Sequence, residues 1–444
     1  MSLPILAAAT AHAATLPTPW MVLPFMALLL CIALMPLFAA HFWEHHYPKV
    51  AVGLGLFTAA YYILSLHHPD AVMHAMTEYL SFMALIGSLF IISGGINIRV
   101  KGEATPMVNV TFLLIGALLA NVIGTTGASM LLIRPWIRMN KYRITSFHIV
   151  FFIFVVSNVG GALTPIGDPP LFLGFLRGIP FWWIIQHVWS AWALAIALLL
   201  AVFYVLDTKN FKRAPREVAE RETRQETWMF RGLHNLLLLG VVLGAVFLPQ
   251  TWKISISAFS ISVSSLIMMA AAATSYLTTP PPIHEANDFN FGPVKEVGLL
   301  FIGIFLTMIP ALDILSSGHG LHLNSPLQFY FASGALSAFL DNAPTYLAFL
   351  AAAMGGHQLD IGNPADVLMF LEKDPTFVIA VSLGAVFFGA GSYIGNGPNF
   401  MVKAIAEKAR VRTPDFLGYI FRFSLPILIP ILAFVGWLML GLGK

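Results

Sequence analysis

A helix-breaking run inside a long apolar stretch constrains this chain more than any other feature. Residues 157–172, SNVGGALTPIGDPPLF, contain three glycines and three prolines. Pro lacks the backbone N–H that a helix needs and Gly carries a high backbone entropy, so the run predicts a break. Freed backbone groups are tolerated at membrane depth only inside protein or beside a cavity. The alternative is a kinked helix followed by a surface loop.

The composition shows why this stretch must be judged as membrane sequence. Of the 444 residues, 58% are hydrophobic and 10% are charged, against about 25% charged residues in soluble domains. We therefore expect an all-α polytopic protein whose surroundings are the lipid bilayer. The net charge of +3 gives no reason to expect a nucleic-acid partner. The single cysteine, Cys31, excludes an intramolecular disulfide and a thiolate metal cluster.

Apolar segments of roughly 20 residues predict transmembrane helices. We expect ten, at residues 20–40, 48–66, 73–98, 144–178, 182–206, 232–249, 254–277, 295–316, 375–404 and 416–442. Two further apolar stretches, 106–138 and 325–356, are interrupted near the middle by NVIGTTGAS and DNAPT. We expect each to be a re-entrant hairpin of two half-helices.

The positions of the basic residues predict the topology. Stretch 106–138 has basic residues on both flanks, and cytoplasmic loops are enriched in Lys and Arg, which favours a hairpin over a crossing. The same rule predicts both termini outside, in a bacterial inner membrane. It leaves outside only four of the 24 Lys and Arg residues, namely Arg177, Lys253, Lys373 and Lys444. The first residues resemble a signal peptide but lack a positive n-region, so we expect a short outer leader.

An internal repeat supports the functional interpretation of the break. TPIGDPP at 164–170 aligns with SYIGNGP at 392–398, and the hairpin tips align Asn121 with Asp341 and Thr125 with Thr345. In the predicted topology the two units have opposite orientations. Inverted repeats of this kind place their broken helices around a site near the bilayer midplane.

The repeat divides the chain into five parts. We expect a leader with scaffold helices at 1–72, a first inverted repeat at 73–206, a cytoplasmic linker at 207–231, scaffold helices with a Pro-rich connector at 232–294, and a second inverted repeat at 295–444. The repeats contain the hairpins 106–138 and 325–356 and the broken helices 144–178 and 375–404. A docking or regulatory role for the charged linker is the alternative to a plain connection.

Two acids fall inside the predicted breaks. Ionisable residues within the membrane are costly, which makes Asp168 and Asp341 candidates for binding cations and protons. Sodium, the metal expected at these two aspartates, prefers oxygen ligands. The polar residues expected to line the site, unless they merely cap broken helix ends, are Asn121, Thr125, Asn158, Thr164, Asn342, Thr345, Ser392, Asn396 and Asn399.

Other polar residues in apolar segments have simpler interpretations. Glu78 and Asp313 lie near the predicted outer ends of their helices, where we expect them to reach water and act structurally. Lys403 could pair with a buried carboxylate, although an interfacial position is the simpler expectation. The histidines, His148 among them, are expected at interfaces, and none has metal-ligand spacing.

The order of hairpin and broken helix carries a family resemblance. ANVIGTTGASMLL followed by GGALTPIGDPP, and FLDNAPTYLAF followed by GAGSYIGNGPN, resemble the ion-transporter superfamily that contains sodium:proton antiporters and citrate or dicarboxylate carriers. The resemblance covers most of residues 73–442. The carboxylates at the breaks resemble the antiporter branch more closely, because the carboxylate carriers show Ser-Asn-Thr at their hairpin tips. The resemblance also implies a homodimer with a fixed scaffold and a moving transport domain.

Three function classes follow. The first is sodium:proton antiport by alternating access, and the second is sodium- or proton-coupled uptake of citrate or another dicarboxylate. Two ionised aspartates would repel a multivalent anion, which weighs against the second. A membrane enzyme or a structural subunit is the third, but no phosphate-binding loop or nucleophile constellation is present in the sequence. We expect no cofactor beyond sodium ions and protons as transported or coupling ions.

Overall fold

The structure is a computed structural model that describes residues 16–99, 104–213, 229–249, 251–256, 259–318 and 323–441. The predicted leader and most of the predicted linker lie outside the described residues.

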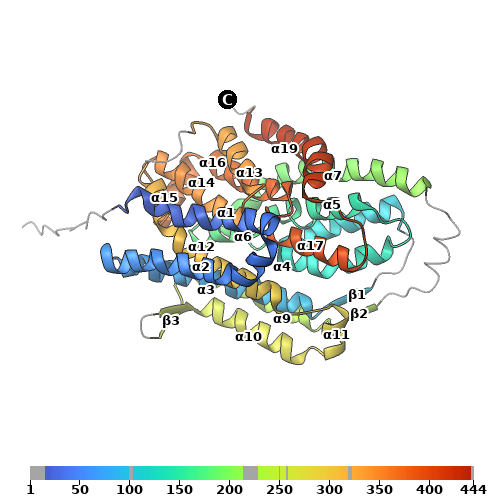
Figure 1. Cartoon of the computed structure of the whole chain (residues 1–444), viewed down its shortest axis with the longest axis horizontal. Helices are drawn as coiled ribbons and strands as arrows, with labels where there is room; N and C mark the ends of the chain where they lie inside the picture. Colours follow the sequence, from blue (N-terminus) through green and yellow to red (C-terminus); the bar gives the residue numbers. More distant parts are fainter. Residues whose placement is uncertain are drawn as a thin grey trace, which may run out of the picture.

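Helices dominate the first half of the chain (Figure 1). They are α1 (Leu23–Phe38), α2 (Ala40–Ala60), α3 (Pro69–Gly94), α4 (Pro106–Met139), α5 (Ser146–Val155), α6 (Pro169–Leu176) and α7 (Phe181–Arg213). A short strand, β1 (Asn97–Arg99), pairs antiparallel with β2 (Met229–Arg231) after the linker.

The second half repeats the helical pattern. Its helices are α9 (Asn235–Val246), α10 (Val263–Thr278), α11 (Pro281–Ala286), α12 (Gly292–Ser316), α13 (Pro326–Ser337), α14 (Asn342–Gly356), α15 (Pro364–Lys373), α16 (Pro375–Phe388), α17 (Gly397–Lys408), α18 (Phe416–Tyr419) and α19 (Ile429–Gly436). A second two-stranded sheet joins β3 (Lys253–Ile256) to β4 (Phe259–Ser262).

Eight helices of the described chain are long and apolar enough to span a membrane, and the bent pair of α15 and α16 makes up to nine. The polytopic class is therefore confirmed. The eight include α4, which was predicted as a hairpin, and they lack three of the ten predicted spans: 232–249, 254–277, and 375–404, whose first half belongs to the bent pair. α9 has 12 residues and α10 has 16, and residues 253–256 and 259–262 form strands instead of helix. The reason is visible in the sequence KISISAFSIS, where Ile and Ser alternate with the period of a strand.

The 106–138 stretch folds back on itself within α4. Gly124 has φ 75° and ψ 156°, a conformation open to glycine, and it separates two arms. The Asn109 amide donates to the Asn140 side-chain oxygen at 2.8 Å, although a straight helix would hold residues 31 apart at about 46 Å. In the second half, α13 and α14 form the corresponding pair, and Phe329 of one contacts Phe349 of the other.

Both predicted helix breaks are present. The first helix half ends at Val155 and α6 begins at Pro169, with a 3-10 turn at Val159–Leu163 between them. In the second break α16 ends at Phe388, a 3-10 turn follows at Gly389–Gly391, and α17 begins at Gly397. Each second half has Pro in its first turn, where the missing N–H costs nothing.

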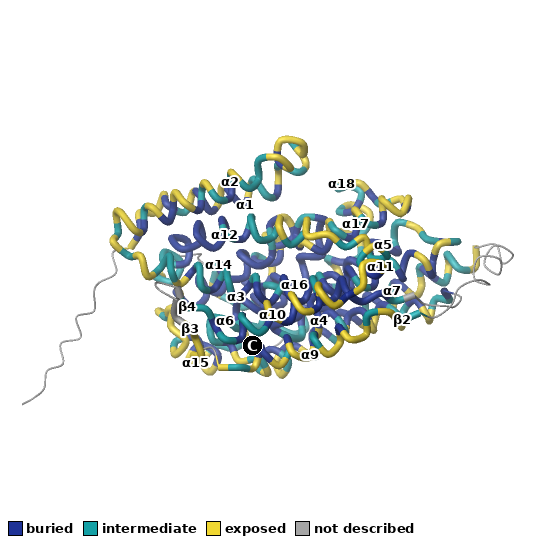
Figure 2. The backbone as a smooth tube through the Cα atoms, turned by 90° about the horizontal axis from the view of Figure 1, so that it is seen from below, coloured by how far each residue is buried: buried dark blue, intermediate teal, exposed yellow. Residues whose placement is uncertain are grey.

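The broken helices occupy the centre of the molecule. Figure 2 shows dark buried backbone through the middle and exposed backbone along α1 and α2 at one edge. All residues of α5 from His148 to Val155 are buried. α3 and α12 pack on each other, α10 covers α3, and α2 covers α12. The breaks are thus enclosed by protein, as unpaired backbone groups at membrane depth require.

Candidate ion-binding site

Asp168 is the centre of the site. Its side chain is buried, with 1% of the residue exposed, and Asp168 occupies the N-cap position of α6 without a capping hydrogen bond from its side chain. Oδ1 accepts from the Thr125 hydroxyl at 2.6 Å and from Asn396 Nδ2 at 2.9 Å, and Oδ2 accepts from Asn342 Nδ2. Thr125 comes from the first hairpin, Asn342 from the second, and Asn396 from the second break. Both halves of the chain therefore converge on one carboxylate.

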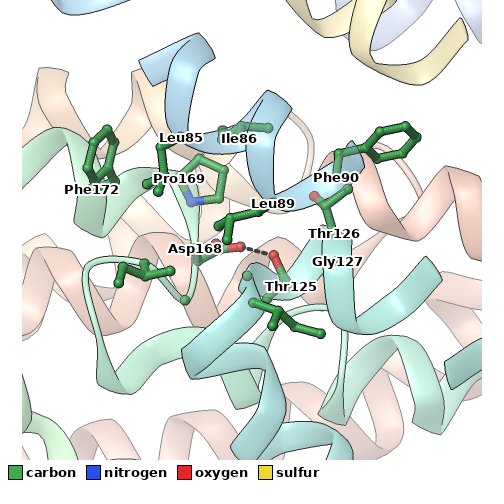
Figure 3. A pocket seen from close by; sticks show the side chains of 14 residues that line it. Leu85, Ile86, Leu89, Phe90, Thr125, Thr126, Gly127, Asp168, Pro169 and Phe172 are labelled. Carbon is green, nitrogen blue, oxygen red and sulfur yellow. Dashed lines mark hydrogen bonds between the residues drawn. The ribbon is translucent and has the colours of Figure 1, made fainter. Parts of the chain in front are cut away.

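A small cavity lies beside this carboxylate (Figure 3). Its volume is about 20 Å³, and its wall includes Thr125, Thr126 and Asp168 together with apolar side chains of α3. A space of this size holds about one water molecule. In Figure 3 the Thr125 hydroxyl points directly at the Asp168 carboxylate.

A line of amides connects the two breaks. Asn396 Nδ2 also reaches Asn158 Oδ1 at 3.2 Å, and Asn158 Nδ2 donates to Asn399 Oδ1 at 2.6 Å. Asn399 in turn donates to the carbonyls of Gly389 and Ser392. All three asparagines are at most 2% exposed. They orient the second break relative to the first and keep polar groups near Asp168 paired.

Four of the predicted lining residues form hydrogen bonds with backbone groups of nearby turns and helix ends. Asn121 donates to the carbonyls of Ala117 and Gly160 and accepts from Leu163 N. Thr164 donates to the Asn121 carbonyl, Ser392 accepts from Ile394 N, and Thr345 donates to the Asp341 carbonyl. These are the capping roles that were the alternative at the sequence level.

Asp341, the second predicted carboxylate, caps α14. Its Oδ1 accepts from Ala343 N at 3.0 Å. The next residue, Asn342, makes the contact to Asp168, so the second hairpin tip touches the site through an amide. The oxygen of that amide, Asn342 Oδ1, is buried and has no hydrogen-bond partner among the described residues. It is an acceptor available to a ligand.

Three helix N-termini meet at the site. α6 begins after Asp168, α14 after Asp341, and α17 after Asn396. Helix N-termini carry partial positive charge and stabilise a nearby anion, either a carboxylate of the protein or an anionic ligand.

The remaining predicted charges lie elsewhere. Glu78 is 8% exposed and pairs with Arg177 at 2.8 Å beside a cavity of about 210 Å³ that both residues line. Asp313 accepts from the Tyr62 hydroxyl at 2.6 Å. Lys403 pairs with Glu407 at 3.1 Å, and the Glu407 side chain is half exposed. Within the described residues no group of three His, Cys, Asp or Glu could hold a metal ion.

The sequence analysis missed a buried charge cluster around Asp207. This acid, near the end of α7, accepts from Arg143 and lies 3.0 Å from His148 Nε2, and all three residues are buried. Asn109 also donates to Asp207, at 2.8 Å. His148 is therefore in the core and not at an interface. The available signal was a lone acid in the apolar sequence before the linker, but its partners lie 59 to 98 residues away.

No curated protein matches the chain. A family model described as "putative citrate transport" matches residues 13–440. Its description agrees with a polytopic membrane chain whose breaks enclose a polar site. Because the match spans nearly the whole sequence, the chain belongs to this citrate transporter-like family of membrane transport proteins.

Proposed function

We propose that the protein is a secondary active transporter that exchanges sodium for protons at Asp168. The observation that carries the proposal is a buried carboxylate held only by uncharged donors. The ion pairs found among the described residues involve other acids. A buried carboxylate without a cationic partner must bind either a proton or a cation. Sodium and protons therefore compete for the same group, which is the chemical basis of antiport.

The surroundings of Asp168 suit a small cation. Unpaired Asn342 Oδ1, the Thr125 hydroxyl and the carboxylate supply oxygen ligands. The adjacent cavity of about 20 Å³ is comparable with one water molecule. Pockets that hold drug-sized molecules are about 300–1,000 Å³. Asp341 is proposed as the second carboxylate of the exchange, supplied by the opposite half of the chain.

The test is sodium-driven proton flux in proteoliposomes with a pH-sensitive dye inside. Asp168→Asn is expected to reduce the flux to that of empty liposomes, because the amide cannot release a proton. The matched control is Glu372→Gln, the same change on an exposed acid of α15. Full flux in Asp168→Asn would overturn the assignment.

Asp341→Asn tests the second carboxylate separately. Asn caps a helix about as well as Asp, so the variant is expected to fold while exchanging fewer protons for each sodium ion. Unchanged stoichiometry would leave Asp341 as a cap alone.

Coupled uptake of citrate or another dicarboxylate is the second candidate. Two observations favour it: the description of the family and the three helix N-termini that meet at the site. Labelled citrate is added to the same proteoliposomes with and without sodium. Sodium-dependent citrate accumulation, without sodium-driven proton flux in the absence of citrate, would favour this candidate over antiport.

We further propose the orientation and assembly expected from the sequence. α4 and the α13–α14 pair enter the membrane and return to the face from which they came, and both termini lie outside a bacterial inner membrane. A cysteine introduced into residues 214–228 should then be labelled only from the cytoplasmic side. The homodimer is expected to form through segments 20–66 and 232–277, which cross-linking of cysteines on α1 or α10 would test.

A further inference from the structure

Two ion-pair clusters lie at opposite ends of α3. The first joins Glu78 to Arg177, with 2.8 Å between Oε2 and Nη2, and His74 lies 3.4 Å from the other Glu78 oxygen. Arg177 follows α6 directly, so this cluster connects α3 to the helix that begins after Asp168. A cavity of about 210 Å³ opens beside the pair, and Asp313 and Asp360 also line it.

The second cluster centres on Asp288, in the connector between α11 and α12. Its Oδ2 lies 3.7 Å from Arg134 of α4 and 3.3 Å from Lys408 of α17. The preceding residue, Asn287, donates to the carbonyls of Gly94 and Ile96 at the C-terminal end of α3. Asp288 is therefore fixed to α3, while its partners belong to the elements that carry Thr125 and Asn396.

The distance between the clusters follows from helix geometry. Glu78 and Gly94 are 16 residues apart on α3, which corresponds to about 24 Å. In Figure 1, α15 lies at the left end of the molecule and β1, β2 and α11 lie toward the right. Residue Asp360 of the first cavity precedes α15, and Asp288 follows α11. The two clusters thus lie toward opposite ends of the molecule.

Between the second cluster and the site lies an aromatic contact. Phe289, next to Asp288, packs on Phe90 of α3 with 5.5 Å between ring centres. Phe90 also lines the small cavity beside Asp168. Moving Arg134 and Lys408 away from Asp288 would separate the site-bearing elements from this aromatic cover.

We propose that the Glu78–Arg177 and Asp288–Arg134–Lys408 clusters are two gates that hold the site-bearing elements against α3 at opposite ends and open in alternation. This rests on the proposed function only in that a transporter must expose its site to each side in turn. The two gates differ in strength. The Glu78 and Arg177 side chains are 9% and 10% exposed, whereas in the second cluster only Arg134 is similarly enclosed, at 14%, and Asp288 is 53% and Lys408 72% exposed. An exposed pair contributes little, while removing one partner of a buried pair leaves a charge without compensation.

The experiment measures accessibility and needs no transport. Cys31 is the only cysteine of the chain, so Cys31→Ser gives a cysteine-free background. Thr126→Cys, at the cavity beside Asp168, is then labelled with a membrane-impermeant maleimide in right-side-out and in everted vesicles. Glu78→Gln is expected to raise labelling several-fold from the Arg177 end and to lower it from the other end. Asp288→Lys is expected to raise labelling from the Asp288 end and to lower it from the Arg177 end. The expected change is about twofold, because Asp288 and Lys408 are exposed.

A charge exchange separates gating from general damage. Glu78→Arg combined with Arg177→Glu should restore the labelling pattern of the parent, since the pair is re-formed. Equal changes from both faces, or no change in either variant, would overturn the proposal. If Glu78→Gln fails to fold, the labelling pattern of Asp288→Lys, a substitution on an exposed loop, tests the proposal by itself. Loss of transport with an unchanged labelling pattern would reject the gates and leave the function of Asp168 intact.

Discussion

The two helix breaks have nearly the same backbone and different charge. Asp168 occupies the N-cap position of α6 with φ −143° and ψ 145°, and Asn396 occupies that of α17 with φ −154° and ψ 140°. Each follows a short 3-10 turn and a glycine and precedes a helix with Pro in its first turn. The first break supplies a carboxylate, and the second supplies an amide that donates to it. The first half therefore supplies the carboxylate, and the second half supplies an amide that holds this carboxylate in place.

Exchanging Asp168 and Asn396 between the two breaks is expected to have the largest effect on transport. Asn396→Asp alone would put two carboxylates within hydrogen-bond distance, which prevents both from ionising, so transport should fall nearly to the background of Asp168→Asn. The double variant Asp168→Asn with Asn396→Asp moves the single charge to the second break. It is expected to recover part of the sodium-driven proton flux. A double variant as inactive as Asp168→Asn would show that the breaks differ in more than charge.

Gly167, directly before Asp168, is expected to be important for the stability of the first break. A Cβ on Gly167 would lie 2.0 Å from the Gly161 carbonyl oxygen, because the unwound chain crosses itself there. Gly167→Ala is therefore expected to cost about 3 kcal/mol, at the upper end of overpacking effects, measured by thermal unfolding in detergent. Gly397→Ala, in the second break, is the control because nothing lies within 4 Å of its Cβ position. If Gly167→Ala leaves the unfolding temperature unchanged, the backbone around Gly161 and Gly167 must be able to shift and make room for the methyl group.

The smallest expected effect distinguishes the two hairpin tips. Thr125 and Thr345 align in the repeat, but the Thr125 hydroxyl reaches Asp168 and the Thr345 hydroxyl reaches a carbonyl of its own helix. A hydrogen bond to a charged group contributes about 1.5–3 kcal/mol. Thr125→Val should raise the KM for sodium about tenfold or more, and Thr345→Val should leave it nearly unchanged. Equal effects would place both tips in the site.

The breaks were predictable because Gly and Pro act locally. The run 157–172 and its partner near 392–398 end helices wherever they occur, and the repeat indicated which polar residues converge. Pairings across the fold were not predictable. The alignment matched Asn121 with Asp341, yet the residue of the second tip that contacts Asp168 is Asn342. A shift of one position changes which side chain faces the site, and only packing determines it.

The Asp207 cluster was missed for a related reason. His148 was expected at an interface, and Arg143 is one of the basic residues that follow stretch 106–138, so neither was expected to have a buried partner. Their partner lies on α7, and burial of all three is possible only because they pair with one another. Short apolar helices such as α9 posed the opposite problem, since hydropathy alone cannot distinguish a span from a buried core helix.

The bonds between the first hairpin tip and the first break have one more consequence. Thr125 N donates to the Gly167 carbonyl at 2.8 Å, and Asn121 bonds to Gly160 and Leu163 on the same segment. The hydroxyl and the carboxylate that face each other are thus fixed to a common backbone. Under the proposed function these two sodium ligands stay together whichever side is open, so without a membrane potential the intrinsic sodium dissociation constant is expected to be equal from both faces of the membrane.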